Sequence, residues 1–324
     1  MRNDIMLNSE MTYVGSVSEY LGALESLSDQ VPSEPGAYCC QLVFRGQPDI
    51  AYELLPTIGR GGRAWLPDKG YVSVEPKGLA NESNYIAAAC QRLPSLFNGG
   101  LSPIDLLARL QHYGIPTRLL DVTTNALAAL YFACSGNRDN ESSSAGEVIV
   151  FRCPAYDLVD YPVSQAIADS WRILPNAGTL SSFVQRAIGQ PYFRYQTELL
   201  MNVRGGTGEL EDWVAQCCGQ LLFVRGSASL DRQSAQSGMY ILFPNAIEGH
   251  DSEGARDDRL SKFGSRIEEI PKDHKAIAAR IAVDGNSKKA IMRELRTLGV
   301  TEGSLFPDSV DAICRDIRLQ VESL

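Results

Sequence analysis

The sequence predicts a mixed α+β fold. Short apolar runs typical of strands occur at 37–45, 146–153, 220–224 and 239–243, in the front, middle and late parts of the chain. Segments with helical periodicity lie between these runs and continue through the C-terminal part. Strands and helices distributed in this way favour an α+β domain.

Length and composition indicate a globular protein with a substantial core. The chain has 324 residues, of which 44% are apolar and 21% are charged. This length corresponds to one large domain or two moderate ones. The formal net charge is -9, whereas surfaces that hold a nucleic-acid backbone are usually basic. Any contact with nucleic acid is therefore expected to be local.

Cysteine usage and the N-terminal residues favour a reducing compartment. The eight cysteines form no C-x-x-C pair, and most lie among apolar residues, as reduced core cysteines do. Residues 1–10 lack the apolar stretch of a signal peptide, and no apolar run reaches the roughly 20 residues that span a bilayer. We expect a cytoplasmic protein that does not contact a membrane.

The first part of the chain is predicted to hold one helix and one strand. Residues 1–36 form an N-terminal helical segment, with an apolar stripe at 16–29. The apolar stretch 37–45 predicts a buried strand that ends at Gly46. The region 58–79 is rich in glycine, proline and charge, so we interpret it as an irregular surface excursion.

Three helices are predicted next. The first lies near 81–96, and the second lies at 103–113, where a Ser-Pro pair is a standard entry signal. Residues 126–135 are strongly helical, with Thr124 or Asn125 as the N-cap.

The remaining chain divides into an insertion and a tail. Residues 155–220 have mixed polarity and a glycine-rich stretch, so we interpret them as an insertion in the main domain at 37–271. The tail at 272–324 is predicted to be helical, in segments that include 273–284, and to pack on the main domain.

An arginine in an apolar setting is the first candidate for function. Arg45 ends the stretch 37–45, where a guanidinium is costly unless an anion or several acceptors meet it. Gly46 allows the chain to turn or a ligand to approach the backbone. The alternative is an arginine in a salt bridge with a local Asp or Glu, and the sequence leaves both open.

The stretch 111–125 (QHYGIPTRLLDVTTN) is the second candidate. His112 lies at the end of a predicted helix, where the dipole favours a protonated imidazole. In an extended segment Arg118 and Asp121 point to opposite faces unless the chain bends. The stretch is either part of an active site or a hydrogen-bonded turn in the core. A hydrolase that uses His112 with Asp121, or His112 with a cysteine, stays open.

The stretch 231–243 (DRQSAQSGMYILF) is the third candidate. Arg232 and Gln236 precede a predicted strand that begins at Gly238, and the alternative is a capped turn between a helix and a strand. No G-x-S-x-G elbow, G-x-x-x-x-G-K-[ST] loop or H-E-x-x-H motif occurs. The three histidines are too scattered to suggest a metal site, so no metal is expected.

Together these stretches resemble the FRG domain, which is named after a Phe-Arg-Gly motif. The similar segments, in chain order, are 44–47, 55–56, 60, 111–114, 116–121, 129–133, 232–238, 267–271, 275, 298–299 and 304–308. The resemblance covers roughly 37–310, and it covers 155–220 least well.

The FRG domain in turn resembles ADP-ribosyltransferases distantly, which implies a split β-sheet core with flanking helices. In the arginine-first branch of those enzymes, an early strand ends in Tyr/Phe-Arg-Gly, and its arginine holds a phosphate of NAD. A middle strand precedes an A-x-x-F-A helix, and a late strand carries a catalytic glutamate. Here Gln236 stands where that glutamate is expected, and a glutamine cannot act as a base.

The resemblance implies roles for the candidate residues. Those that would bind NAD, the substrate, are Arg45, Gly46, Tyr113, Arg118, Thr123 and Thr124. Those that would serve catalysis are Asp121, Gln236 and His112. Asp121 would stabilise the cationic sugar that forms when nicotinamide leaves.

The leading hypothesis is therefore an NAD-dependent enzyme that transfers ADP-ribose to a protein or nucleic acid. The resemblance implies a toxin in a bacterial toxin–antitoxin or phage-defence system, with an antitoxin or chaperone protein as partner. The alternatives are an NAD glycohydrolase and a non-catalytic module that binds a nucleotide or a partner. Gln236 in place of glutamate is the main support for the non-catalytic module.

Overall fold

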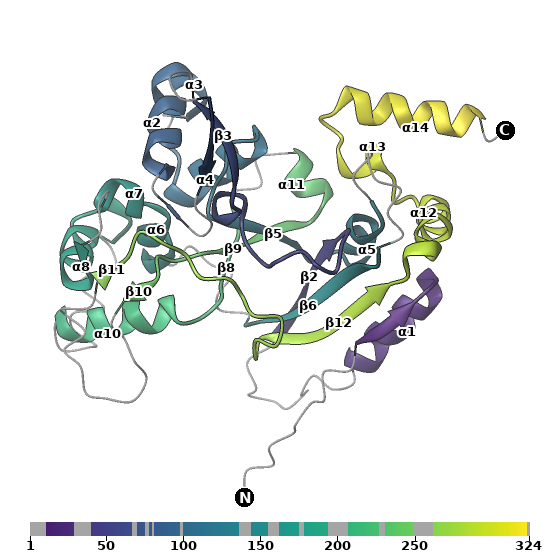
Figure 1. Cartoon of the computed structure of the whole chain (residues 1–324), viewed down its shortest axis with the longest axis horizontal. Helices are drawn as coiled ribbons and strands as arrows, with labels where there is room; N and C mark the ends of the chain where they lie inside the picture. The colour runs from purple at the N-terminus through teal and green to yellow at the C-terminus, as the bar shows by residue number, and fades with distance from the viewer. Residues whose placement is uncertain are drawn as a thin grey trace, which may run out of the picture.

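A seven-stranded β-sheet organises the chain into a mixed α+β fold (Figure 1). The structure is a computed structural model that describes residues 11–28, 40–66, 70–74, 78–79, 81–97, 100–135, 144–154, 162–174, 178–193, 207–226, 231–248 and 262–322. The strands of the sheet, in spatial order, are β1 (Thr12–Val14), β12 (Ile277–Val283), β6 (Gly146–Pro154), β2 (Cys40–Gln47), β5 (Leu119–Thr123), β9 (Gly238–Leu242) and β8 (Leu222–Val224). β1 and β12 are parallel, and the other neighbours are antiparallel.

The sheet divides into two parts at its centre. β2 pairs with β6 from Cys40 to Gln47, but it pairs with β5 only where Phe44 faces Thr123. β5 continues the sheet through β9 and β8. Because β2 and β5 diverge after one residue pair, the backbone groups along this junction need other partners.

Each part of the sheet packs against its own helices, and a further core cluster joins apolar residues of β2 and β6 with those of β5, β9 and β8. α1 (Val17–Ser28), α5 (Ala126–Cys134) and α12 (Lys288–Thr297) pack on the part that contains β2, β6 and β12. The other part packs against a larger helical region (Figure 1) made of α2 (Glu82–Arg92), α3 (Pro94–Phe97), α4 (Pro103–His112), α6 (Pro162–Ala168), α7 (Ser170–Ile173), α8 (Leu180–Ile188) and α10 (Thr207–Cys218). No helix within the described ranges is long and apolar enough to cross a membrane.

Shorter elements complete the fold. α11 (Asp231–Ala235) lies within the third candidate stretch, and α13 (Glu302–Leu305) and α14 (Val310–Glu322) lie in the tail. The others are η1 (Thr57–Gly59), η3 (Pro191–Phe193), η5 (Gly285–Ser287), β3 (Gly62–Leu66), β4 (Gly70–Val74), β7 (Gly178–Thr179), β10 (Ile247–Glu248) and β11 (Lys262–Phe263).

Predictions that depend on local signals are confirmed. The strands predicted at 146–153, 220–224 and 239–243 are β6, β8 and β9. The helix predicted at 103–113 is α4, and its N-cap Ser102 accepts a hydrogen bond from the backbone N–H of residue 105. α5 begins after Asn125, whose side chain accepts from two backbone N–H groups of the first turn.

Predictions that depend on long-range pairing need correction. The segment 273–284, for which the sequence predicts a helix, contains β12, because its backbone groups pair with β1 on one side and β6 on the other. Its alanines favour a helix locally, but two neighbouring strands outweigh that preference. The region 58–79 contains the β3–β4 hairpin rather than only irregular chain. The strand predicted at 37–45 continues through Gly46 as β2, and residues 37–39 lie outside the described residues.

Candidate functional site

A cavity of about 400 Å³ opens beside the junction of β2 and β5. Its wall combines residues from β2, from the stretch 111–125 and from the turn that leads into β9. Among these are Arg45, His112, Asp121, Thr123, Gln233 and Gln236. The three stretches singled out in the sequence thus meet at one site. Gly46, which the resemblance also implies as a binding residue, lies in the same wall.

Arg45 bridges the diverging strands. Its Nη1 donates to the backbone carbonyl of Asp121 at 2.7 Å, and its Nε donates to Gln47 Oε1 at 3.4 Å. Burial lowers the pKa of Arg45 to about 10, and the nearby Arg60 guanidinium adds to this shift while the Asp121 carboxylate opposes it. Arg45 therefore stays cationic at neutral pH. Its remaining N–H groups are suited to an anion in the cavity.

Asp121 is held by a short chain of hydrogen bonds. Its Oδ1 accepts from Gln111 Nε2 at 2.8 Å, and Gln111 Oε1 accepts from Thr117 Oγ1 at 2.6 Å. Of the described residues that line the cavity, Asp121 is the one with a carboxylate. A role for Gln111 does not follow from the sequence, because its contact with Asp121 joins the end of α4 to β5.

Thr123 connects β5 to the turn before β9. Its hydroxyl donates to the carbonyl of Gln236 at 2.5 Å and accepts from the backbone N–H of Asn125 at 2.8 Å. The Gln236 side chain donates from Nε2 to the carbonyl of Leu305 at 3.0 Å. The next residue, Ser237, has a positive φ of 48°, which is uncommon for a residue with a side chain. Thr123 therefore helps to hold a strained turn at the cavity wall.

This arrangement predicts different effects for the two neighbouring threonines. Thr123→Val removes both hydrogen bonds of a buried hydroxyl, so we expect a loss of about 1–3 kcal/mol in the free energy of unfolding. Thr124 lies outside the cavity wall, and its hydroxyl makes only a 3.4 Å contact with the carbonyl of Ser237. Thr124→Val should therefore change stability by less than about 0.5 kcal/mol. Urea denaturation of both variants measures the difference, and equal effects would contradict the assigned contacts.

His112 faces a residue from the tail. Its Nε2 lies 3.5 Å from Asp308 Oδ2, whereas Asp121 is bonded to Gln111. The proposed His112–Asp121 dyad is thus not formed. No cysteine of the described residues lines the cavity, so a Cys–His pair is not formed there either. Tyr113 is 55% exposed and packs edge-on against His112, outside the cavity wall.

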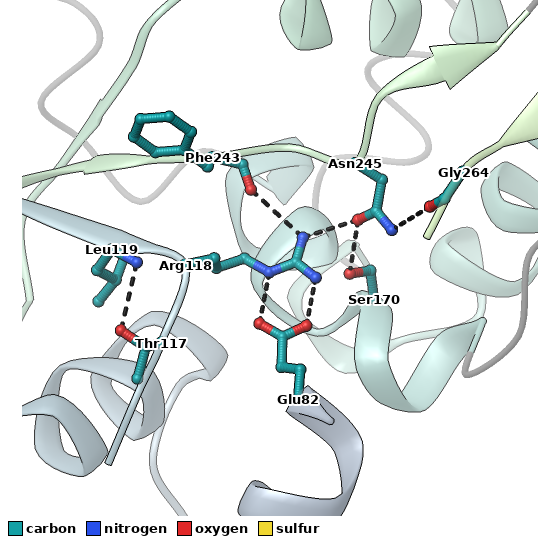
Figure 2. Close-up of polar contacts among 8 residues, drawn as sticks. All are labelled: Glu82, Thr117, Arg118, Leu119, Ser170, Phe243, Asn245 and Gly264. Atoms are coloured by element: carbon teal, nitrogen blue, oxygen red, sulfur yellow. Dashed lines mark hydrogen bonds and ion pairs between the residues drawn. The ribbon is translucent and has the colours of Figure 1, made fainter. Parts of the chain in front are cut away.

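Arg118 lies in the core and not at the cavity (Figure 2). Its guanidinium makes two hydrogen bonds to the Glu82 carboxylate, and Nη1 also donates to Asn245 Oδ1 at 2.7 Å. Asn245 in turn donates to the carbonyl of Gly264 at 2.7 Å and accepts from Ser170 Oγ at 3.1 Å. The alternation of an extended chain explains why Arg118 and Asp121 separate. Arg118 therefore connects the helical region to the sheet instead of facing a ligand.

Comparison with known proteins supports one part of the expected kinship. A family model described as FRG domain matches residues 40–142. No curated protein and no solved structure matches the chain significantly. The matched segment contains Arg45, His112, Asp121 and Thr123, but it ends before Gln236.

Proposed function

From this match we propose that the FRG segment and the turn before β9 form a site that binds NAD and transfers its ADP-ribose to a macromolecule. The observation that carries the proposal is the meeting of Arg45, Asp121, Thr123 and Gln236 at one cavity. The site offers a cation for phosphate, a carboxylate for a developing positive charge, and amide groups for ribose hydroxyls.

The arrangement of strands supports an ADP-ribosyltransferase-like core. In this chain β2 is the strand with Phe-Arg-Gly, and β5 is the middle strand, which α5 follows. The late strand is β9. These three strands are neighbours in the sheet, and β2 diverges from β5 after one residue pair. A junction of this kind is what a split sheet requires.

The reaction that this site would carry out breaks one bond and forms another. The bond between nicotinamide and ribose C1′ breaks, and its electron pair leaves with nicotinamide, which becomes neutral. A nucleophilic atom of the acceptor then bonds to C1′ and loses a proton to Asp121 or to water. Asp121 would stabilise the cationic sugar, while Gln236 would hold a ribose hydroxyl but take no proton. Arg45 would bind the diphosphate in the orientation that this requires.

Turnover and binding measured separately test the proposal. Asp121→Asn is expected to bind NAD within about threefold of wild type but to release nicotinamide at least about 100-fold more slowly, because it lacks the charge that stabilises the transition state. Arg45→Lys should weaken NAD binding by about tenfold or more, because it loses the bidentate geometry. Calorimetry gives the binding constant, and chromatography gives released nicotinamide.

The control is Arg293→Ala, which removes an exposed arginine whose side chain donates to the carbonyl of Lys289 in its own helix. It should match wild type in both assays. Labelled NAD with protein and nucleic-acid extracts distinguishes transfer from hydrolysis by water. Binding without nicotinamide release under any acceptor condition would favour the non-catalytic module, and absence of NAD binding would reject the proposal.

A further inference from the structure

One polar group at the cavity wall has no partner within the described part of the chain. Gln233 lies in α11, lines the cavity and is 8% exposed. Its Oε1 is buried and makes no hydrogen bond to any described residue. A buried amide oxygen without a donor is unfavourable, so such groups are uncommon in folded proteins.

The neighbouring backbone holds the Gln233 side chain in place. A Cβ added at Gly238 would lie 3.3 Å from Gln233 Cγ, and one added at Gly226 would lie 3.4 Å from Gln233 Nε2. The Gln233 side chain therefore lies beside the first residue of β9 and the residue that follows β8 by two positions.

The other glutamines nearby are engaged with the protein. Gln111 both donates and accepts, and Gln236 donates to the carbonyl of Leu305. Gln165, a buried glutamine in α6, accepts from the backbone N–H of Ile104 at 3.2 Å. Gln233 lines the cavity and differs because its side-chain acceptor is buried and receives no hydrogen bond from a described residue.

We infer that Gln233 selects the ligand by accepting a hydrogen bond from an N–H group of it. The inference rests on the proposed function, because in NAD the candidate donors are the nicotinamide carboxamide and the adenine amine. Arg45 lies on β2, whereas Gln233 lies in the helix before β9, with β5 between these strands. A ligand that reaches both residues carries an anion at one end and a planar N–H donor at the other, as a nucleotide does.

The first test needs no ligand. Gln233→Met keeps the size of the side chain and removes the unpaired acceptor, so the melting temperature of the full-length protein should rise. The matched control, Gln165→Met, removes an acceptor that is used, so its melting temperature should fall. A fall for Gln233→Met would show that its amide is already satisfied and would overturn the inference.

The second test uses two analogues that each lack one donor. The 3-acetylpyridine analogue of NAD lacks the carboxamide N–H, and the hypoxanthine analogue lacks the adenine amine. Wild-type protein should bind one of them about tenfold or more weakly than NAD. Gln233→Met should bind NAD and that analogue equally. The discriminated analogue identifies the end of NAD that Gln233 contacts.

The outcomes separate the inference from the proposed function. If NAD binds but neither analogue is discriminated, or if Gln233→Met still discriminates, the inference fails and the proposed function stands. If wild-type protein binds no NAD, the proposed function fails. In that case only the melting temperatures test the inference. A higher melting temperature for Gln233→Met supports an acceptor that binds an N–H group of some other ligand, and no increase overturns the inference.

Discussion

Gly46→Ala is expected to lower the free energy of unfolding by more than about 4 kcal/mol, a loss that few single substitutions cause. A Cβ at this position would lie 1.9 Å from the carbonyl oxygen of Ala129 and 2.8 Å from the backbone nitrogen of Ala133. Both atoms belong to the backbone of α5, so no side chain can move aside, and the helix itself must shift. α5 follows β5 directly, and its shift would also disturb Asp121.

A second glycine provides the control for this prediction. Gly22 lies in α1, and a Cβ there would meet nothing within 4 Å. Gly22→Ala should therefore stabilise the protein by about 0.5–1 kcal/mol, the usual gain when alanine replaces glycine inside a helix. Urea denaturation followed by circular dichroism measures both variants. If Gly46→Ala stays within about 1 kcal/mol of wild type, α5 does not lie as close to β2 as described.

Arg118→Met is expected to cost about 3–5 kcal/mol, because it leaves the Glu82 carboxylate buried without its cation. The Arg118 and Glu82 side chains are 1% and 3% exposed, and Figure 2 shows the guanidinium hydrogen-bonded to acceptors from two parts of the chain, Glu82 and the segment 243–245. Replacing both residues with methionine should restore much of the stability, since no unpaired charge then remains at this position in the core. Equilibrium unfolding of both single variants and the double variant gives the coupling energy.

A partly exposed pair in which the arginine also makes two hydrogen bonds to one carboxylate is the matched control. Arg315 also makes two hydrogen bonds to one carboxylate, that of Glu302, but these side chains are 39% and 29% exposed. Arg315→Met should cost only about 0–1 kcal/mol, because water solvates the remaining charge. Similar losses at both arginines would show that burial does not determine the cost. Retention of NAD binding by a folded Arg118 variant would agree with its place outside the cavity.

Local signals in the sequence were enough for part of the fold and for part of the site. The caps at Ser102 and Asn125 act within a few residues, so the starts of α4 and α5 were predictable. The apolar runs of β6, β8 and β9 are likewise local patterns. Three polar residues of the site could be recognised in the sequence, because charged and hydroxyl side chains are unusual in apolar strands. These residues are Arg45, Asp121 and Thr123.

Long-range contacts explain what could not be predicted. The alanine-rich segment of β12 becomes a strand only because β1 and β6 lie on either side of it. Gly46 was interpreted as a turn or a place of ligand approach, yet its immediate neighbour is the backbone of α5. Gln111 lies in a segment similar to the FRG domain, but its contact with Asp121 and the unpaired acceptor of Gln233 depend on which groups meet in space.

The sequence by itself therefore determined the α+β character, the similarity of residues 40–142 to the FRG domain and several of the polar residues that reach the cavity. Only the tertiary structure decided that Arg118 belongs to the core while Asp121 belongs to the cavity, although three positions separate them. It also decided that His112 meets Asp308 and that Gln233 keeps an unused acceptor. The physical reason is that the alternation of an extended chain shows only that Arg118 and Asp121 point to opposite faces. The groups that each side chain contacts on its face come from distant segments of the chain.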